Sequence, residues 1–138
     1  MGVTEMKLSK RSEYACLALI DLAQHYNIGL VKISDVSSRS NIPKKFLEQI
    51  LLNLKSAGYV KSVRGANGGY KLAKEPCEIT LAETIRLFDG ALAPVESVSV
   101  NYYEHTPIEQ NEKLLGIFKD IRDYVANKLE TTTYANLI

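Results

Sequence analysis

The residues best suited to chemistry lie in a glycine-rich stretch, residues 63–70, which reads VRGANGGY. Gly and Asn tolerate positive φ angles, so this composition predicts the tip of a tight β-hairpin. A hairpin alone requires neither an arginine nor a third glycine. A guanidinium on a thin backbone suits the narrow minor groove of A·T-rich DNA, whose negative potential attracts arginine. The residues predicted to contact DNA here are Arg64, Gly65, Asn67 and Gly68.

A second group of polar side chains lies at the start of a predicted helix over residues 43–57. In a major groove, lysine can bond guanine or phosphate, glutamate can accept from the cytosine amine, and glutamine can pair with adenine. The members of this group are Lys44, Lys45, Phe46, Glu48 and Gln49. Phe46 could either touch a thymine methyl or pack in the core. Lys44 and Lys61 are also candidates to bind phosphate, which fixes register without reading sequence.

The elements that would hold these residues form a helix-turn-helix. A first helix is predicted over residues 9–26 and a short one over residues 35–40, with Ser34 as its N-cap and Asn41 as its C-cap. The helix over residues 43–57 follows after a brief turn, since its initial proline pre-sets φ for a first helical turn. Its predicted buried face has the i, i+3, i+4, i+7 spacing of an amphipathic helix and consists of Leu47, Ile50, Leu51 and Leu54.

Two short strands, residues 59–63 and 69–73, are predicted to flank the glycine-rich tip. Two helices joined by a short turn and followed by a hairpin make a winged helix. In such a fold the second helix enters a groove and the hairpin reaches the flanking backbone. The alternative is an ordinary solvated hairpin with an exposed arginine, and the helix-turn-helix directly upstream disfavours it.

The formal net charge of the 138-residue chain is only +1, but its two halves differ. Residues 1–75 carry twelve Lys/Arg and six Asp/Glu, a balance of +6, whereas residues 76–138 carry five and ten, a balance of −5. This asymmetry indicates a basic working module joined to an acidic remainder. We therefore expect a winged helix-turn-helix DNA-binding domain, residues 1–75, and a helical connector and dimerisation region, residues 76–138.

The acidic half opens with a capping box formed by Thr80 and Glu83, which predicts a helix that ends at Gly90. Residues 91–105 show no clear hydrophobic period and are predicted to form a connector. Residues 132–138 could form a last short turn.

A second capping box, formed by Thr106 and Glu109, predicts a helix that continues to residue 129 and is about 34 Å long. This is the longest helix expected, and its apolar stripe lies outside the compact module. The stripe residues predicted to mediate dimerisation are Leu114, Ile117, Phe118, Ile121 and Val125. A second copy of the chain is the economical partner for this stripe. The alternative is that the helix packs back on its own domain.

Little in the sequence supports catalysis. The GxSxG, HExxH and P-loop patterns are absent, and the two histidines belong to no catalytic constellation, so we do not expect an enzyme. Cys16 and Cys77 lie far apart and in no CxxC pattern, so they indicate neither a metal site nor a disulfide. No apolar run reaches transmembrane length and no signal-peptide pattern occurs, which predicts a cytoplasmic protein without membrane contact.

The chain resembles the Rrf-two family of bacterial winged-helix transcription regulators, and two sequence blocks carry most of the likeness. Residues 43–51 (PKKFLEQIL) and 62–72 (SVRGANGGYKL) look like the two signature blocks of that family. The resemblance covers nearly the whole chain. It implies a homodimer joined by the long C-terminal helix and bound to a roughly palindromic operator. It also implies that the residues aligned with Glu48 and Arg64 contact bases and the minor groove, respectively.

One departure from the family concerns iron. Members that sense iron, nitric oxide or redox state hold an iron–sulfur cluster on three cysteines between the fourth helix and the dimer helix. Residues 91–107 contain no cysteine, and thiolates are what hold such clusters. In the absence of cysteines, the cluster would need other ligands from this segment. The candidates are poor replacements for thiolates, and they are Glu96, Glu104 and His105. The chain is thus similar to the cluster-free members, among which a repressor of cysteine metabolism responds through a protein partner.

These observations predict a homodimeric repressor that binds double-stranded DNA without a metal or other cofactor. Either a regulatory protein or a small-molecule effector would control it, the latter in a pocket lined by Tyr102, Tyr103 or Phe118. Two alternatives stay open here: a winged helix used as a protein-interaction module, and a cluster-binding redox or iron sensor with unusual ligands. The balance of +6 on the winged-helix half favours DNA over a protein partner.

Overall fold

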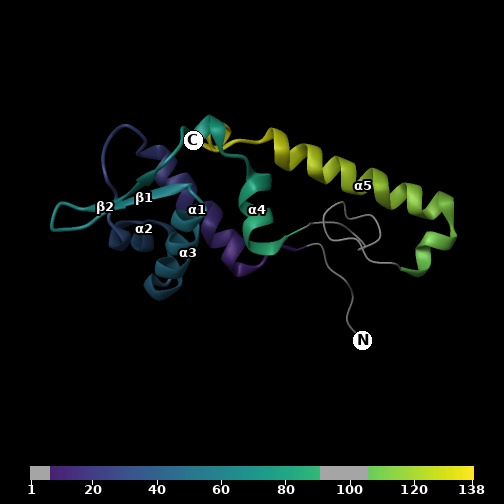
Figure 1. Ribbon diagram of the computed structural model, residues 1–138, viewed down its shortest axis with the longest axis horizontal. Helices are drawn as coiled ribbons and strands as arrows, with labels where there is room; N and C mark the ends of the chain where they lie inside the picture. The colour runs from purple at the N-terminus through teal and green to yellow at the C-terminus, as the bar shows by residue number, and fades with distance from the viewer. Residues whose placement is uncertain (1–6, 91–105) are drawn as a thin grey trace.

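The computed structural model describes residues 7–90 and 106–138, and Figure 1 shows their arrangement. The elements in chain order are α1 (Lys10–Gln24), α2 (Ile33–Ser40), α3 (Lys44–Ser56), β1 (Val60–Val63), β2 (Gly69–Leu72), the 3-10 turn η1 (Pro76–Glu78), α4 (Leu81–Asp89), the 3-10 turn η3 (Pro107–Gln110), α5 (Glu112–Thr131) and the 3-10 turn η4 (Tyr134–Leu137). The predicted fold class, mainly α-helical with one small β-hairpin, is confirmed.

Some sequence predictions fall outside the described residues. The connector predicted for residues 91–105 is one of them. The side chains concerned, which were considered for a cluster or an effector pocket, are Glu96, Tyr102, Tyr103, Glu104 and His105.

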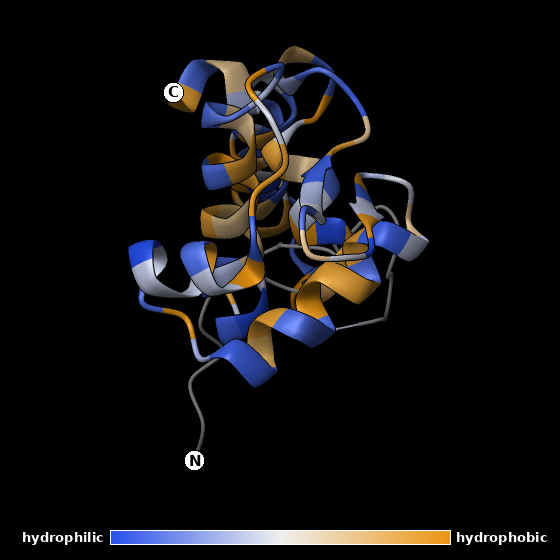
Figure 2. Ribbon diagram, turned by 90° about the vertical axis from the view of Figure 1, so that its left-hand side faces the viewer, coloured by the Kyte–Doolittle hydropathy of each residue, from blue (hydrophilic) through white to orange (hydrophobic). Residues whose placement is uncertain are grey.

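Helix α1 is the central element of the winged helix. The side chain of Ser9 caps it by accepting a hydrogen bond from the backbone N–H of Ser12. The helices α2, α3 and α4, the strand β2 and the turn η4 all pack against α1. Figure 2 shows hydrophobic and hydrophilic residues interleaved along the helices, as amphipathic helices around a shared core require.

Helices α2 and α3 form the predicted helix-turn-helix. Asn41 ends α2 in the left-handed conformation, with φ 53° and ψ 47°, as its residue type predicted. The prediction of Ser34 as the N-cap is wrong, because α2 begins two residues earlier than expected, at Ile33, and Lys32 takes the cap position without a side-chain hydrogen bond. The early start of α2 has a tertiary origin. Val31, two residues before α2, pairs with Tyr70 in an antiparallel bridge, which fixes the backbone directly before the helix.

Strands β1 and β2 form the predicted antiparallel hairpin, each within one residue of its expected bounds. The register pairs Val60 with Leu72 at the base and Val63 with Gly69 next to the tip. At the base, Val60 and Leu72 are both buried and so anchor the hairpin in the core. The tip extends away from the helices (Figure 1).

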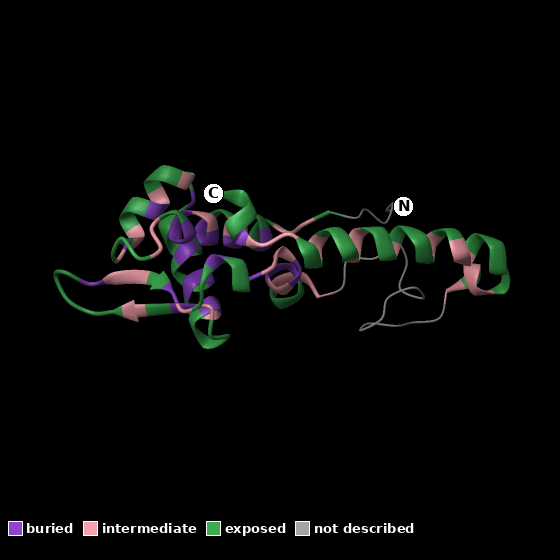
Figure 3. Cartoon of the chain, turned by 90° about the horizontal axis from the view of Figure 1, so that it is seen from above, coloured by how far each residue is buried: buried purple, intermediate pink, exposed green. Residues whose placement is uncertain are grey.

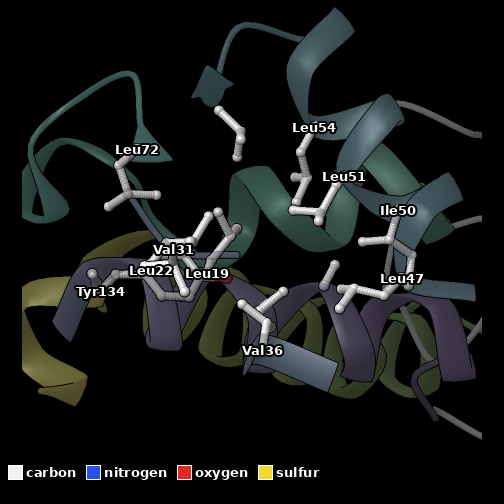
Figure 4. Close-up of a cluster of buried hydrophobic side chains, with 14 of the residues drawn as sticks. Leu19, Leu22, Val31, Val36, Leu47, Ile50, Leu51, Leu54, Leu72 and Tyr134 are labelled. Carbon is white, nitrogen blue, oxygen red and sulfur yellow. The ribbon is translucent and has the colours of Figure 1, made fainter. Parts of the chain in front are cut away.

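The core collects side chains from α1, α2, α3, the hairpin and the segment after α5 (Figure 4). Leu19, Val36, Leu47 and Leu54 are completely buried within it. Tyr134 is completely buried in the same cluster, although it comes from the far end of the described chain.

Helix α4 begins at the capping box predicted for Thr80 and Glu83. The backbone N–H of each residue donates to the side-chain oxygen of the other, both at 3.2 Å. Gly90 ends the helix with a positive φ of 75°. Helix α5 begins far from the winged helix and runs back toward it, so that its C-terminal end lies beside it (Figure 1), and none of its residues is buried (Figure 3).

The second predicted capping box forms, but it does not open the long helix. Thr106 and Glu109 cap only the short turn η3. Asn111 interrupts the helical path in an extended conformation, and its side chain accepts a 3.0 Å hydrogen bond from the N–H of Leu114. Asparagine competes with the backbone in this way and favours cap positions. Consequently α5 starts at Glu112, and its 20 residues span about 30 Å instead of 34 Å.

Candidate nucleic-acid interface

Helix α3 presents two faces of opposite character. The predicted buried face is confirmed, since Leu47, Ile50, Leu51 and Leu54 are each at most 1% exposed. The polar side chains predicted to read DNA are all exposed, and they are Lys44, Lys45, Glu48 and Gln49. Because the apolar face fixes α3 on the core, these side chains project together into solvent from its first two turns.

Phe46 combines the two positions that the sequence left open. It is 45% exposed, and its ring packs against Tyr14 of α1 in an edge-to-face contact with the centroids 5.6 Å apart. Such a contact fixes the ring while leaving part of it accessible. An apolar contact with a thymine methyl therefore stays geometrically open.

The tip of the hairpin is shaped by two glycines. Gly65 has a φ of 111°, and its carbonyl accepts a 3.0 Å hydrogen bond from the N–H of Gly68. A Cβ at Gly68 would overlap the carbonyl oxygen of Val63, so this glycine is required by the turn itself. The sequence analysis instead explained Gly68 by a close approach of the backbone to DNA. Arg64 and Asn67 are exposed at the tip, as a nucleic-acid contact requires.

A basic cleft of about 470 Å³ lies between the hairpin, the start of α2 and the end of α3. Three cationic residues line it: Lys32, Lys55 and Arg64. The ammonium of Lys32 donates a 3.0 Å hydrogen bond to the carbonyl of Ala66 and so ties α2 to the tip. A cleft lined by one sign of charge attracts polyanions. Sequence reasoning missed Lys32 and Lys55, for which only the basic balance of the first 75 residues gave a signal.

Lys61 also has a neighbour that the sequence analysis did not consider. The register places it opposite Lys71, and both side chains are exposed. Like charges directly opposite each other destabilise a hairpin. A phosphate between the two ammonium groups would relieve that repulsion, which is consistent with the predicted phosphate contact of Lys61.

The stripe predicted to mediate dimerisation is largely uncovered. Leu114, Ile117 and Ile121 of α5 are 39%, 56% and 39% exposed. The other two stripe residues, Phe118 and Val125, are partly buried. Three large apolar side chains at i, i+3 and i+7 spacing therefore face solvent in a single chain.

The cysteines do not fit an iron–sulfur cluster. The chain has only two of them, one fewer than the three that such regulators use. Burial raises the pKa of the Cys16 thiol, and partial desolvation together with Glu75 raises that of Cys77. Both shifts oppose the thiolate form that binds iron. Across residues 7–90 and 106–138, no group of three or more His, Cys, Asp or Glu residues is arranged to hold a metal ion.

A helix-turn-helix with an exposed polar recognition helix and a basic wing defines a DNA-binding transcription regulator. A sequence model of the Rrf2 family, described as iron-dependent transcriptional regulators, matches residues 8–138, and the chain belongs to this family. The resemblance found in the two signature blocks is thereby confirmed. The family consists of regulators, which agrees with the prediction that the chain is not an enzyme. No helix in the described part of the chain could span a membrane.

Individual relatives lead to the same class. The regulator CymR of Bacillus subtilis (strain 168) is 33% identical over 132 residues, which cover 96% of this chain and 89% of CymR. The regulator IscR of Aliivibrio salmonicida (strain LFI1238) is 42% identical over 87 residues, 63% of this chain and 52% of IscR. The solved structure of B. subtilis CymR, named there the global cysteine regulator, matches with a TM-score of 0.78 at 34% identity and covers 95% of each chain. The structure of T. potens IscR matches with a TM-score of 0.75 at 29% identity, over 99% of this chain and 88% of IscR.

Proposed function

We propose that this Rrf2-family regulator acts as a homodimeric repressor that binds a palindromic operator without an iron–sulfur cluster. One observation carries the proposal. Helix α3 and the hairpin, which carry the exposed residues predicted to contact DNA, lie at one end of the molecule, and α5, which carries the exposed Leu114, Ile117 and Ile121, extends toward the other (Figure 1). Each chain can therefore bind DNA at one end and a second copy at the other.

On DNA, the start of α3 enters the major groove. Lys45, Glu48 and Gln49 then reach base edges, where their hydrogen-bonding groups discriminate between base pairs. Arg64 at the hairpin tip enters the adjacent minor groove. The remaining cations fix the register on phosphates, and they are Lys32, Lys44, Lys55, Lys61 and Lys71.

The dimer forms along α5. Ile117 and Ile121 lie one turn apart on the same side of the helix, and both are exposed in the structure. Packing against the same stripe of a second chain removes this surface from water, at about 25 cal/mol per Å² of apolar area. The resulting two-fold axis relates two copies of α3, which explains why a palindromic site would be preferred.

The donor set supports the proposed cluster-free state. Two thiols with raised pKa values cannot supply the three thiolates that the family's cluster proteins use. In this proposal a protein partner or a small molecule supplies the regulatory signal. The similarity to a structure named as a global cysteine regulator favours a signal connected with cysteine.

The test is a selection of bound fragments from the source genome with the purified full chain, followed by sedimentation of the protein alone and with the selected duplex. We expect a two-fold symmetric sequence bound by two chains, and a reporter gene behind it that is more active when the regulator is deleted. Affinity for random duplex should fall steeply with added salt, because phosphate contacts release counterions. Salt-independent binding would instead support a protein-interaction module. A brown colour after anaerobic reconstitution with iron and sulfide would contradict the cluster-free state.

A further inference from the structure

Tyr134 connects the dimer helix to the DNA-binding module. It follows α5 by three residues, and its side chain is completely buried among winged-helix residues such as Leu19 and Leu22 (Figure 4). Its hydroxyl forms a 2.7 Å hydrogen bond with the hydroxyl of Thr84 in α4, which is itself 1% exposed. A buried hydroxyl pair of this kind is costly to separate, because each partner would be left unsatisfied.

The backbone around Tyr134 is held as firmly as its ring. The N–H of Tyr134 donates to the carbonyl of Ile79 at 3.1 Å, and the N–H of Leu81 donates to the carbonyl of Thr132 at 2.9 Å. These bonds flank an antiparallel bridge between Thr80 and Thr133. The segment that leaves α5 is therefore paired directly with the start of α4.

The pairing of residues 132–134 with residues 79–81 forms a joint between α5 and the winged helix, and hydrogen bonds also hold the last turn of α5 beside this joint. The hydroxyls of Thr131 and Thr132 donate to the carbonyls of Asn127 and Lys128, both at 2.7 Å. Arg86 of α4 also forms a 3.2 Å ion pair with Glu130 of α5. The helix is thus fixed at its end next to Tyr134, whereas no residue along its length is buried.

We propose that Tyr134 is a positioning residue that fixes the direction of α5 on the winged helix and so selects the spacing between operator half-sites. The inference rests on the proposed homodimer. In that dimer, two copies of α5 and their attachments to the winged helix relate the two α3 helices. A 10° rotation about the joint displaces the far end of a 30 Å helix by about 5 Å. One base pair advances the duplex by about 3.4 Å. A joint that can rotate by 10° would therefore let the dimer bind half-site spacings that differ by one base pair.

A purely core-filling role for Tyr134 makes a different prediction, and an insertion separates the two. Two glycines placed between Thr131 and Thr132 leave Tyr134 in the core but free the helix from it. The same two glycines placed between Gln110 and Asn111, before α5, are the matched control. If Tyr134 only fills the core, neither insertion should alter DNA spacing.

The experiment uses the operator recovered by selection and a series of duplexes in which one or two base pairs are added or removed between its half-sites. Wild-type protein should prefer one spacing over its neighbours by roughly tenfold, the size of one lost base contact. The insertion after Thr131 should reduce this preference to about twofold or less, with melting temperature, dimer state and affinity for a single half-site unchanged. The control insertion should keep the wild-type preference.

Tyr134→Phe provides a second variant that keeps the ring and removes the hydroxyl bonded to Thr84. It should reduce the spacing preference less than the insertion does. A dimer that keeps its full preference after insertion at Thr131 overturns the positioning role and leaves the proposed function standing. A wild-type protein that is monomeric on its selected site, or indifferent to spacing, overturns both.

Discussion

The carboxylate of Asp21 in α1 accepts two hydrogen bonds from the guanidinium of Arg39 in α2, each 2.9 Å long. Asp21 is only 5% exposed, and its hydrogen bond is the main cause that raises the pKa of Arg39. A bidentate pair fixes orientation as well as distance. It holds α2 on α1 and thereby sets the platform against which α3 packs.

Replacing Arg39 by leucine should therefore remove the guanidinium from a buried carboxylate and leave it only the ring of His25, whose Nδ1 lies 3.4 Å from Asp21 Oδ1. We expect the free energy of unfolding to fall by about 1–3 kcal/mol, measured by urea denaturation at pH 7. Ser38→Ala, an exposed change on the same helix, is the control and should alter it by less than about 0.5 kcal/mol. Equal stability of the two variants would show that the pair contributes nothing.

The turn at the hairpin tip should tolerate no side chain at Gly68. Gly68→Ala places a methyl group against the Val63 carbonyl, and we expect a loss of about 1–3 kcal/mol in stability together with weaker operator binding. Gly29→Ala is matched to it, because a Cβ at Gly29 meets nothing within 4 Å. Thermal melts and gel shifts of both variants check the prediction, and similar behaviour of the two would contradict it.

Arg64 should contribute to DNA affinity without contributing to stability. Arg64→Ala should weaken binding to the selected operator by about 1–3 kcal/mol if the guanidinium engages the minor groove or bases. Lys113→Ala removes one positive charge from the first turn of α5, away from the hairpin, and should change affinity little. Fluorescence anisotropy titrations at one salt concentration give the comparison. If both variants have the same affinity for the operator, Arg64 does not contact the DNA.

Because of Asp89, the free energy of unfolding should decrease as the pH falls into the acid range. Its carboxylate accepts hydrogen bonds from the backbone N–H and the hydroxyl of Ser9, at the start of α1. Burial alone would raise the pKa of Asp89, but these hydrogen bonds and the charge of Arg11 outweigh it and lower the pKa. Because the folded pKa lies below the unfolded value of about 3.9, the stabilisation is present above that pH and is lost as the pH falls through the folded pKa.

The measurement compares wild type with Asp89→Asn by urea unfolding at several pH values. The wild type should be more stable by about 0.5–1 kcal/mol at pH 7, and the difference should shrink below pH 4. Asp120→Asn, on the exposed surface of α5, removes the same charge and is the control with which the difference is compared. A difference that stays constant down to pH 3 would show that Asp89 does not titrate with folding.

The stripe on α5 should hold the dimer together. Ile117→Glu puts a charge into the proposed interface, and sedimentation should show dissociation at concentrations where the wild type is dimeric. Lys119→Glu introduces the same side chain on the opposite side of the helix and should leave the dimer intact. If the Ile117→Glu protein is still dimeric, the dimer interface does not include this stripe.

Local patterns made much of the fold predictable. The spacing of Leu47, Ile50, Leu51 and Leu54 is sufficient to determine the buried face of α3, because one helix face is set by neighbours within two turns. The left-handed Asn41 is equally local. Where two local signals competed, prediction failed: the Thr106 box favoured an early helix start, and Asn111 supplied a better cap five residues later.

The remaining features depend on tertiary contacts. The cleft beside the hairpin gathers Lys32, Lys55 and Arg64 only because α2, α3 and the hairpin tip fold together. The burial of Tyr134 depends on Thr84, fifty residues earlier, and on the core around α1. No periodicity in the final residues could have indicated a partner at that distance.

The position of Tyr134 also has a consequence for synthesis. The ribosome synthesises all the winged-helix elements before α5, yet the core between α1 and α4 lacks the ring of Tyr134 until that residue emerges. At 5–20 residues per second, the fifty residues between Thr84 and Tyr134 take about 3–10 s to translate. During that time the nascent chain exposes part of an apolar core, so early chaperone contacts should concentrate on the faces of α1 and α4 that Tyr134 finally covers.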